Sequence, residues 1–282
     1  MNTHLDVDLA GTCLRLLGDR ALYWPEQHCL LIADIHFGKA TSFRRLGQPV
    51  PAGTTATNLA RLDRLLHSHD TRRLVFLGDF LHARHGRHDG LWQALADWRE
   101  RHPALHIDLV RGNHDRHAGD PPASLGFDLH EAELLLGPFA LRHEPAPHPE
   151  RHVLAGHLHP CHRLRGPGRQ SLRLPCFALG RSVSLLPAFG EFTGGLEQPA
   201  TPGTRLYLCG DGGVWPVPTA RNHRSGPTTE RVGPEGVRTR ALFIAPCGAL
   251  VAPAFFRDAL LGRYSLASPF FRTCRQQAPP DD

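Results

Sequence analysis

The chain is poor in lysine and has neither a disulfide pattern nor a long apolar run. Its 32 basic residues include one lysine, Lys39, so nearly all of the positive charge is arginine. The seven cysteines are scattered, odd in number and without a CxxC pair, which favours a reducing compartment over a disulfide framework. The sequence contains no stretch of about 18 or more apolar residues, so it predicts no membrane-spanning helix. The opening residues, MNTHLDVDLAGT, lack the features of a signal peptide, so we expect a cytoplasmic protein with no membrane association.

The composition changes near residue 220. Residues 221–282 hold nine arginines against five acidic residues, so most of the net charge of +5 lies there and the rest of the chain is nearly neutral. Overall charge therefore does not by itself indicate a nucleic-acid partner. Residues 221–240 are rich in Arg, Gly, Pro and Thr without periodicity, which is typical of a disordered segment. We predict one domain over residues 1–220 and a low-complexity, irregular and disordered tail over 221–282.

The order of apolar patterns predicts an α/β fold. Residues 12–33 alternate short apolar runs with turns, as a β-meander does, and leucines recur at helical spacing in 54–69 and again in 91–101. Strands and helices alternate up to residue 110, which favours a parallel sheet with right-handed crossovers. The second half predicts a largely β region that packs on this sheet, with short strands at 139–142, 152–155, 172–178, 183–187 and 205–208.

Five polar clusters each follow a short apolar run that predicts a buried strand. In order they are Asp34-Ile35-His36, Gly78-Asp79, Gly112-Asn113-His114-Asp115, His143 and Gly156-His157-Leu158-His159. In open α/β sheets, ligands gather beyond the carboxyl ends of the strands. The five clusters therefore predict a single site that combines carboxylates, imidazoles and one amide.

This set of side chains suits a pair of transition-metal ions. Two ions about 3.5–4 Å apart need a shared ligand, and we assign that role to the carboxylate of Asp79, which has two oxygens. Asp34 and His36 alternate along a segment that we take as extended, which would place both side chains on one face. The same reasoning applies to His157 and His159. Donors of this mix fit Mn²⁺, Fe or Zn²⁺, and the residues alone do not choose among these ions.

His114 stands beside Asn113 and is expected to do chemistry rather than bind metal. We expect it to protonate the leaving-group oxygen, with Asp115 orienting its ring. The expected nucleophile is a metal-bridging hydroxide.

Structural alternatives exist for each residue taken singly. Asp and Asn often cap turns at strand ends. His143 competes for its role with His130, His148 and His152. We expect most other histidines, His67, His69, His82, His85 and His102 among them, to be solvated surface residues.

The clusters resemble the calcineurin-like metallophosphoesterases, whose motifs D-x-H, G-D, G-N-H-[DE], H and G-H-x-H occur here in that order. The resemblance implies an α/β/β/α sandwich of two mixed β-sheets flanked by helices. It implies a catalytic His114 and two metal ions. One ion would be held by Asp34, His36, Asp79 and His159, and the other by Asp79, Asn113, His143 and His157.

Longer segments resemble a narrower group, the ligase-associated DNA damage response endonucleases of the PdeM type. The matching segments are DIHFGKATSFRRLGQPVPAGT, LVFLGDFLHARHGRH, LVRGNHDRHAGDPP, LAGHLHP and LPAFGEFTGG, within residues 5–218. This resemblance implies a Mn²⁺-dependent phosphodiesterase acting on DNA in repair, together with a DNA ligase and a helicase. Residues 221–282 depart from the group, which typically ends near residue 220.

Basic residues on the loops beside the site predict contacts with a phosphate backbone, although exposed arginines are also common without any such role. These residues are Lys39, Arg44, Arg45, Arg84, Arg87 and Arg116. A DNA endonuclease or phosphodiesterase is therefore expected. The rival functions are a small-molecule phosphodiesterase or phosphomonoesterase with the same metals, and a scaffold. A scaffold would be expected to have lost ligands, and this chain has lost none.

Overall fold

The first half of the chain forms a sheet of seven strands in sequence order. In the computed structural model, residues 3–45, 47–48, 50, 53–166, 169–191 and 193–218 are described. β1 to β4 pair antiparallel as the predicted meander, and β4 to β7 pair parallel. The strands are β1 (His4–Leu9), β2 (Thr12–Leu17), β3 (Ala21–Trp24), β4 (Cys29–Ile32), β5 (Arg73–Leu77), β6 (His106–Val110) and β7 (Asp128–His130).

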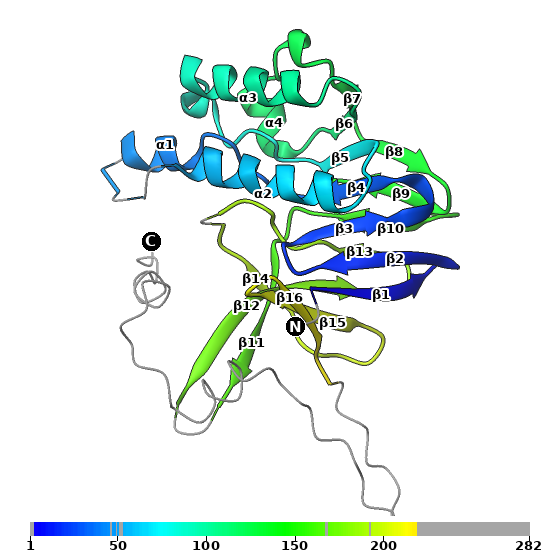
Figure 1. Cartoon of the computed structure of the whole chain (residues 1–282). Helices are drawn as coiled ribbons and strands as arrows, with labels where there is room; N and C mark the ends of the chain where they lie inside the picture. Colours follow the sequence, from blue (N-terminus) through cyan, green and yellow to red (C-terminus); the bar gives the residue numbers. More distant parts are fainter. Residues whose placement is uncertain are drawn as a thin grey trace, which may run out of the picture. The chain divides into compact units, whose positions relative to one another are not determined.

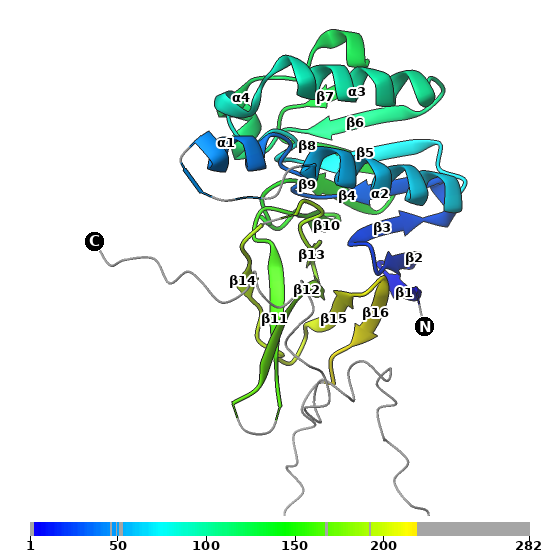
Figure 2. The ribbon, with the colours of Figure 1, turned by 60° about the vertical axis from the view of Figure 1, so that its left-hand side comes forward.

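Helices cover one face of this sheet. Figures 1 and 2 show α2 and α3 lying alongside one another across it. The predicted leucine stripe of α2 and the Leu91, Leu95 and Trp98 side chains of α3 are buried in a core shared with β4 to β6. The helices are α1 (Lys39–Arg45), α2 (Thr54–Ser68), α3 (Asp89–Arg101) and α4 (Asn113–Ala118), with 3-10 turns η1 (Pro25–Gln27), η2 (Arg84–Gly86) and η3 (Ala123–Leu125).

The second half forms the predicted second sheet. Its main path runs β14-β11-β12-β13-β10-β9-β8, and β15 joins β12 and β16. Its strands are β8 (Glu133–Leu136), β9 (Phe139–Arg142), β10 (His152–Ala155), β11 (Pro160–Arg165), β12 (Ser171–Leu179), β13 (Val183–Leu185), β14 (Leu196–Glu197), β15 (Arg205–Gly210) and β16 (Gly213–Pro216).

The two sheets pack face to face through a second apolar core. Leu14, Leu31 and Val75 from the first sheet meet Leu141 and Leu154 from the second. The sandwich of two mixed sheets with helices at its flank is thus confirmed. The four α-helices all belong to the first half, and no helix lies between β8 and β16 in the residues that the structure describes.

Residues 1–164 and 172–220 make up one unit, which contains both sheets. The predicted tail, residues 221–282, lies outside the described residues. None of the described helices is long and apolar enough to cross a membrane.

Candidate metal centre

Five of the predicted metal ligands lie on left-handed backbone. Asp34, His36, Asp79, His157 and His159 have φ of 54°, 49°, 50°, 69° and 46°. Non-glycine residues rarely adopt this conformation, and it concentrates at functional sites, where the surrounding structure holds it in place. The expectation that Asp34/His36 and His157/His159 alternate along extended segments is therefore wrong. Tight turns, rather than strand alternation, bring each pair to the site.

Glycines before the ligands permit very close approaches. A Cβ on Gly78, which itself has φ of 77°, would lie 2.2 Å from Nδ1 of His143. A Cβ on Gly112 would lie 2.2 Å from Oδ1 of Asp79. The G-D and G-N-H motifs thus need glycine because the side chains of His143 and Asp79, which follow other strands, occupy the space where a Cβ would stand.

Asp34, His36, Asp79 and His159 form one cluster, with one potential ligand atom from each lying within 4.8 Å of the others. Nε2 of His36 lies 3.2 Å from Nε2 of His159 and 3.7 Å from Oδ2 of Asp79. Burial lowers the pKa of His36 far below its usual value, and the charge of Lys39 adds to this effect. The imidazole is therefore neutral, as a metal ligand must be.

Asp79, Asn113, His143 and His157 form a second cluster beside the first. Nε2 of His143 lies 2.9 Å from Oδ1 of Asn113 and 3.3 Å from Oδ1 of Asp79. Nδ1 of His157 lies 3.1 Å from that Asn113 oxygen and 3.0 Å from Nε2 of His143. Four histidines were candidates for this ligand position: His130, His143, His148 and His152. His143 is the one that lies in the site, and it is only 3% exposed.

Asp79 belongs to both clusters through different oxygens. Its Oδ2 faces His36, whereas its Oδ1 faces His143. Burial raises the pKa of Asp79; the neighbouring His143 lowers it and Asp34 raises it further. A carboxylate buried between two groups of nitrogen and oxygen donors has the geometry of a bridging ligand.

Backbone carbonyls fix the orientation of two ligand rings. Nδ1 of His143 bonds the carbonyl of Leu77 at 3.0 Å, and Nδ1 of His159 bonds the carbonyl of Gly194 at 3.2 Å. Each carbonyl can only accept, so each ring carries its hydrogen on Nδ1 and turns the Nε2 lone pair into the site. Metal-binding histidines usually have such a partner. The donor chemistry therefore fits a resident metal.

His114 lies at the site, but its predicted partner does not hold it. Asp115 points elsewhere and accepts backbone N–H groups of Phe80, Leu81 and Gly112 at 3.3, 2.9 and 2.9 Å. The prediction that Asp115 orients the His114 ring is wrong, because these three donors occupy its oxygens. Nδ1 of His114 instead bonds the carbonyl of His82 at 2.6 Å, and its Nε2 lies 4.0 Å from Oδ2 of Asp79.

His82 was expected at the solvated surface and lies in the site. Its ring stacks on that of His114, with centroids 5.1 Å apart, and on Phe43 at 5.9 Å. Burial lowers the pKa of His82 to about 4, assisted by the charge of Lys39. The only available signal in the sequence was its position three residues after Asp79, on the same loop.

The predicted phosphate-contacting residues fall into two groups, three on α1 and three that donate to backbone carbonyls elsewhere in the fold. Lys39 begins α1 near Asp34 and Asp79, with burial lowering its pKa, while Arg44 and Arg45 lie exposed at the end of that helix. The other three also make contacts within the fold. Arg84 and Arg87 donate to carbonyls of His117 and Ala118 in α4, and Arg116 donates to the Glu131 carbonyl.

A buried arginine anchors the segment that supports the site. Arg61 on α2 stacks over the ring of Phe189 at 4.0 Å, bonds the carbonyl of that residue, and donates to Glu191 at 2.9 Å. The same segment donates from its backbone to the carbonyls of Ala33 and Asp34, at 2.8 and 3.1 Å. Arg61 thus binds α2 to a segment 128 residues further along the chain, and that segment in turn supports the turn that carries the first ligand, Asp34.

Arg61→Met is expected to destabilise the fold by about 3 kcal/mol, because it leaves buried polar partners unpaired. For a domain of this size the melting temperature should fall by roughly 6–12 °C. Thermal unfolding followed by circular dichroism measures this. Arg64→Met on the exposed face of the same helix is the control and should change little. Equal melting of the two variants would show that Arg61 does not anchor the segment.

The chain is similar to three proteins of known structure, one of them at high sequence identity. No family model and no curated protein matches the chain. Among solved structures, it is similar to the nuclease MPE of Pseudomonas putida, with 51% identity over 76% of this chain and 100% of that one, and a TM-score of 0.68. Two others are remote: AQ665 of Aquifex aeolicus, of unknown function, and the phosphoesterase Yfce of E. coli. AQ665 is 19% identical over 46% of this chain and 78% of its own, with a TM-score of 0.33. Yfce is 14% identical over 65% of this chain and 88% of its own, with a TM-score of 0.31.

The sandwich of two sheets, the buried cluster of histidines and aspartates and the similarity to a nuclease identify a hydrolase that acts on phosphoester bonds. Within that class, the chain belongs to the family of metallophosphoesterase-type nucleases that includes the Pseudomonas putida protein.

Proposed function

We propose that this chain is a metal-dependent phosphodiesterase that cleaves DNA. The observation that carries the proposal is the position of Asp79, whose two oxygens face two separate sets of ligands. Such an arrangement suits a pair of ions that hold the attacking and leaving oxygens of an in-line displacement. The similar protein from Pseudomonas putida is described as a nuclease, which supports phosphodiesters as the substrate class.

The two clusters would hold two divalent ions, and we propose Mn²⁺. When bound, the pair would polarise the phosphoryl group and lower the pKa of an attacking water. Asp34, His36 and His159 would hold one ion, Asn113, His143 and His157 the other, and Asp79 both. The donors are nitrogens and oxygens without thiolate, which suits Mn²⁺ and also leaves Fe and Zn²⁺ as chemically acceptable ions.

His114 would donate a proton to the leaving oxygen. Its Nδ1 donates its hydrogen to the carbonyl of His82, so the proton to be transferred would be a second one, held on Nε2 by the imidazolium form of the ring. That nitrogen faces Asp79 and therefore the place where a bound phosphate would lie. The His82 ring stacked on His114 limits its rotation, which keeps the donor aimed at the leaving oxygen.

Arg44 and Arg45 are expected to contact the DNA backbone beside the scissile phosphate. Replacing both by glutamine should lower kcat/KM on DNA by at least ~10-fold at moderate salt, because two phosphate contacts are lost. Turnover of a small chromogenic phosphodiester should stay within about twofold of that of the unmodified chain, because this ester is too small to reach the end of α1. The matched control is Arg72→Gln with Arg101→Gln, which removes the same charge at two exposed positions, 71% and 54% exposed.

The outcome also decides between DNA and a small substrate. If DNA cleavage and ester hydrolysis were equally unaffected by the Arg44/Arg45 change, these residues would not bind DNA. If the unmodified chain hydrolysed the small ester well and left DNA intact, the function would be that of a small-molecule phosphodiesterase or phosphomonoesterase.

We further propose that this nuclease works in DNA repair beside a DNA ligase and a helicase. The support is the motif resemblance alone. Copurification of the full chain with the ligase and the helicase of its own cell, with the Arg72/Arg101 variant alongside, would test the association. Failure to recover either partner under low-salt conditions would argue against it.

A further inference from the structure

A cavity of about 740 Å³ opens at the end of the sandwich remote from the metal centre. It lies where β1 and β12 end and where β10 and β15 begin, and its wall includes Leu9, His152, Leu179 and Arg205. β10 separates the two sites, because His152 stands at its start and the metal-site turn of His157 follows its other end. Four residues of strand span roughly 13 Å, so one small ligand cannot touch both sites. The volume is in the range of small-molecule sites.

Three arginines line this cavity without a carboxylate partner. Arg151, Arg181 and Arg205 form no ion pair in the described part of the chain, whereas arginines such as Arg15 and Arg73 are paired with aspartates. Arg205 donates to the backbone carbonyl of Asp8 at 3.0 Å, and Arg151 donates to the Gly137 carbonyl. These bonds orient the two guanidinium groups without neutralising them.

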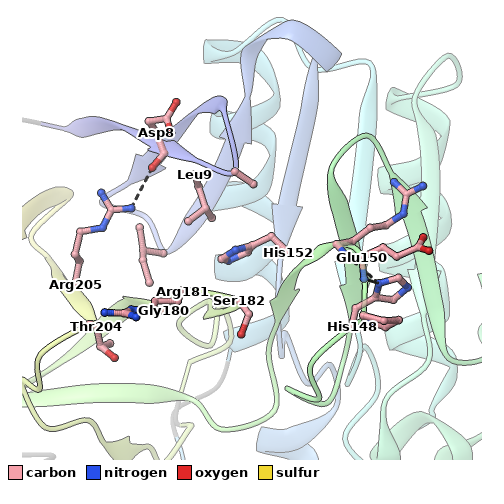
Figure 3. Close-up of a pocket in the computed structure, with 15 residues that line it drawn as sticks. Asp8, Leu9, His148, Glu150, His152, Gly180, Arg181, Ser182, Thr204 and Arg205 are labelled. Atoms are coloured by element: carbon pink, nitrogen blue, oxygen red, sulfur yellow. Dashed lines mark hydrogen bonds between the residues drawn. The ribbon is translucent and has the colours of Figure 1, made fainter.

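Few negative charges oppose these arginines. The lining contains two carboxylates, those of Asp8 and Glu150. Figure 3 shows them on opposite sides of the cavity, with His152 between them. Both belong to exposed residues, where water screens their charge. The interior of the cavity is therefore suited to an anion.

Fixed hydrogen-bond donors complete the lining. Nδ1 of His148 accepts the backbone N–H groups of Glu150 and Arg151, at 3.1 and 3.0 Å, so this ring carries its hydrogen on Nε2. The His152 ring is buried and bonds the hydroxyl of Ser184 through its Nε2 at 2.8 Å, so it shapes the wall and is not itself one of these donors. Ser182 and Thr204 add further hydroxyl groups to the wall. Guanidinium forks combined with imidazole and hydroxyl donors match the oxygens of a phosphate group.

We propose that this cavity is a second phosphate-binding site, separate from the metal centre. The phosphate would belong either to a mononucleotide or to the backbone of a DNA strand. Both sources present the same oxygens to Arg181 and Arg205, and a strand would in addition have to extend beyond the cavity.

The test is calorimetric titration of the full chain with inorganic phosphate, with 5′-dAMP and with a phosphorothioate oligonucleotide. Each titration is run with Mn²⁺ and after chelation, so that binding at the metal centre is separated from binding in the cavity. Arg181→Gln combined with Arg205→Gln should weaken the metal-independent binding at least tenfold. The Arg72→Gln/Arg101→Gln variant, with the same loss of charge, should stay within about twofold of the unmodified chain.

Both arginines of the test pair belong to exposed residues, and circular dichroism checks that the variant folds. Saturable binding of dAMP with no gain from the oligonucleotide would identify a nucleotide site, and much tighter oligonucleotide binding would identify a backbone site. The proposal is overturned if none of the three probes binds without Mn²⁺, or if the two double variants lose affinity equally. None of these readouts involves hydrolysis, so the result stands apart from the proposed nuclease activity.

Discussion

Asp79→Asn is expected to remove nearly all metal-dependent hydrolysis, with a loss of at least ~10³-fold in kcat/KM. The substitution keeps the shape of the side chain but leaves one neutral oxygen where two charged oxygens faced His36 and His143. An amide cannot bridge two ions as a carboxylate can, so the pair should no longer form. Metal analysis of the reloaded protein should show at most one bound ion per chain, and initial rates on DNA measure the loss.

Asp128→Asn is the matched control for Asp79→Asn. It makes the same chemical change at a carboxylate that is 65% exposed on β7, and it should keep both its metal content and its activity. Undiminished metal content and a rate within tenfold of the unmodified chain in Asp79→Asn would exclude the bridging role.

His114→Ala is expected to lower kcat on DNA by about 10²–10⁴-fold while both metal ions stay bound. The reason is that Nε2 of His114 stays 4.0 Å from Oδ2 of Asp79 while its backbone N–H bonds Oδ1 of the same residue at 3.0 Å, so we expect the ring to supply a proton rather than a ligand. The leaving alkoxide of DNA needs that proton, whereas p-nitrophenolate leaves readily without it. The variant should therefore lose much less activity on a p-nitrophenyl phosphodiester than on DNA.

His85→Ala is the control for His114→Ala, because His85 is an exposed histidine on the neighbouring turn η2. It should leave both activities nearly unchanged. An equal loss on both substrates in His114→Ala would assign His114 to binding or positioning. A loss of metal would make it a ligand instead.

The sequence predicted the elements with strong patterns. α2 and α3 were predictable because leucines recur at helical spacing, and β9, β10 and β13 because each is a short apolar run between turns. α1 was not predicted, since its residues, Lys39–Arg45, carry no apolar stripe. β11 was missed for the same reason, because its sequence PCHRLR has neither alternation nor an apolar run.

The sequence predicted which residues form the site, but not the backbone conformation that places them there. Residue types and order brought together the seven proposed ligands, which the structure places in two adjoining clusters. The left-handed turns at Asp34 and His157 were not predictable, because they depend on contacts with distant strands, such as the bond from the His157 N–H to Asp34 at 2.9 Å. The positions of His82 and Asp115 were missed because they too depend on tertiary contacts.

The most direct test of the account is cleavage of circular DNA by the full chain, stripped of metal and reloaded with Mn²⁺. A circle has no ends, so its conversion to linear fragments reports internal cleavage of phosphodiester bonds. The account predicts conversion that requires Mn²⁺, is lost in Asp79→Asn and is kept in Asp128→Asn. Circles and linear strands that both stay intact under all conditions, with two Mn²⁺ ions bound per chain, would contradict it.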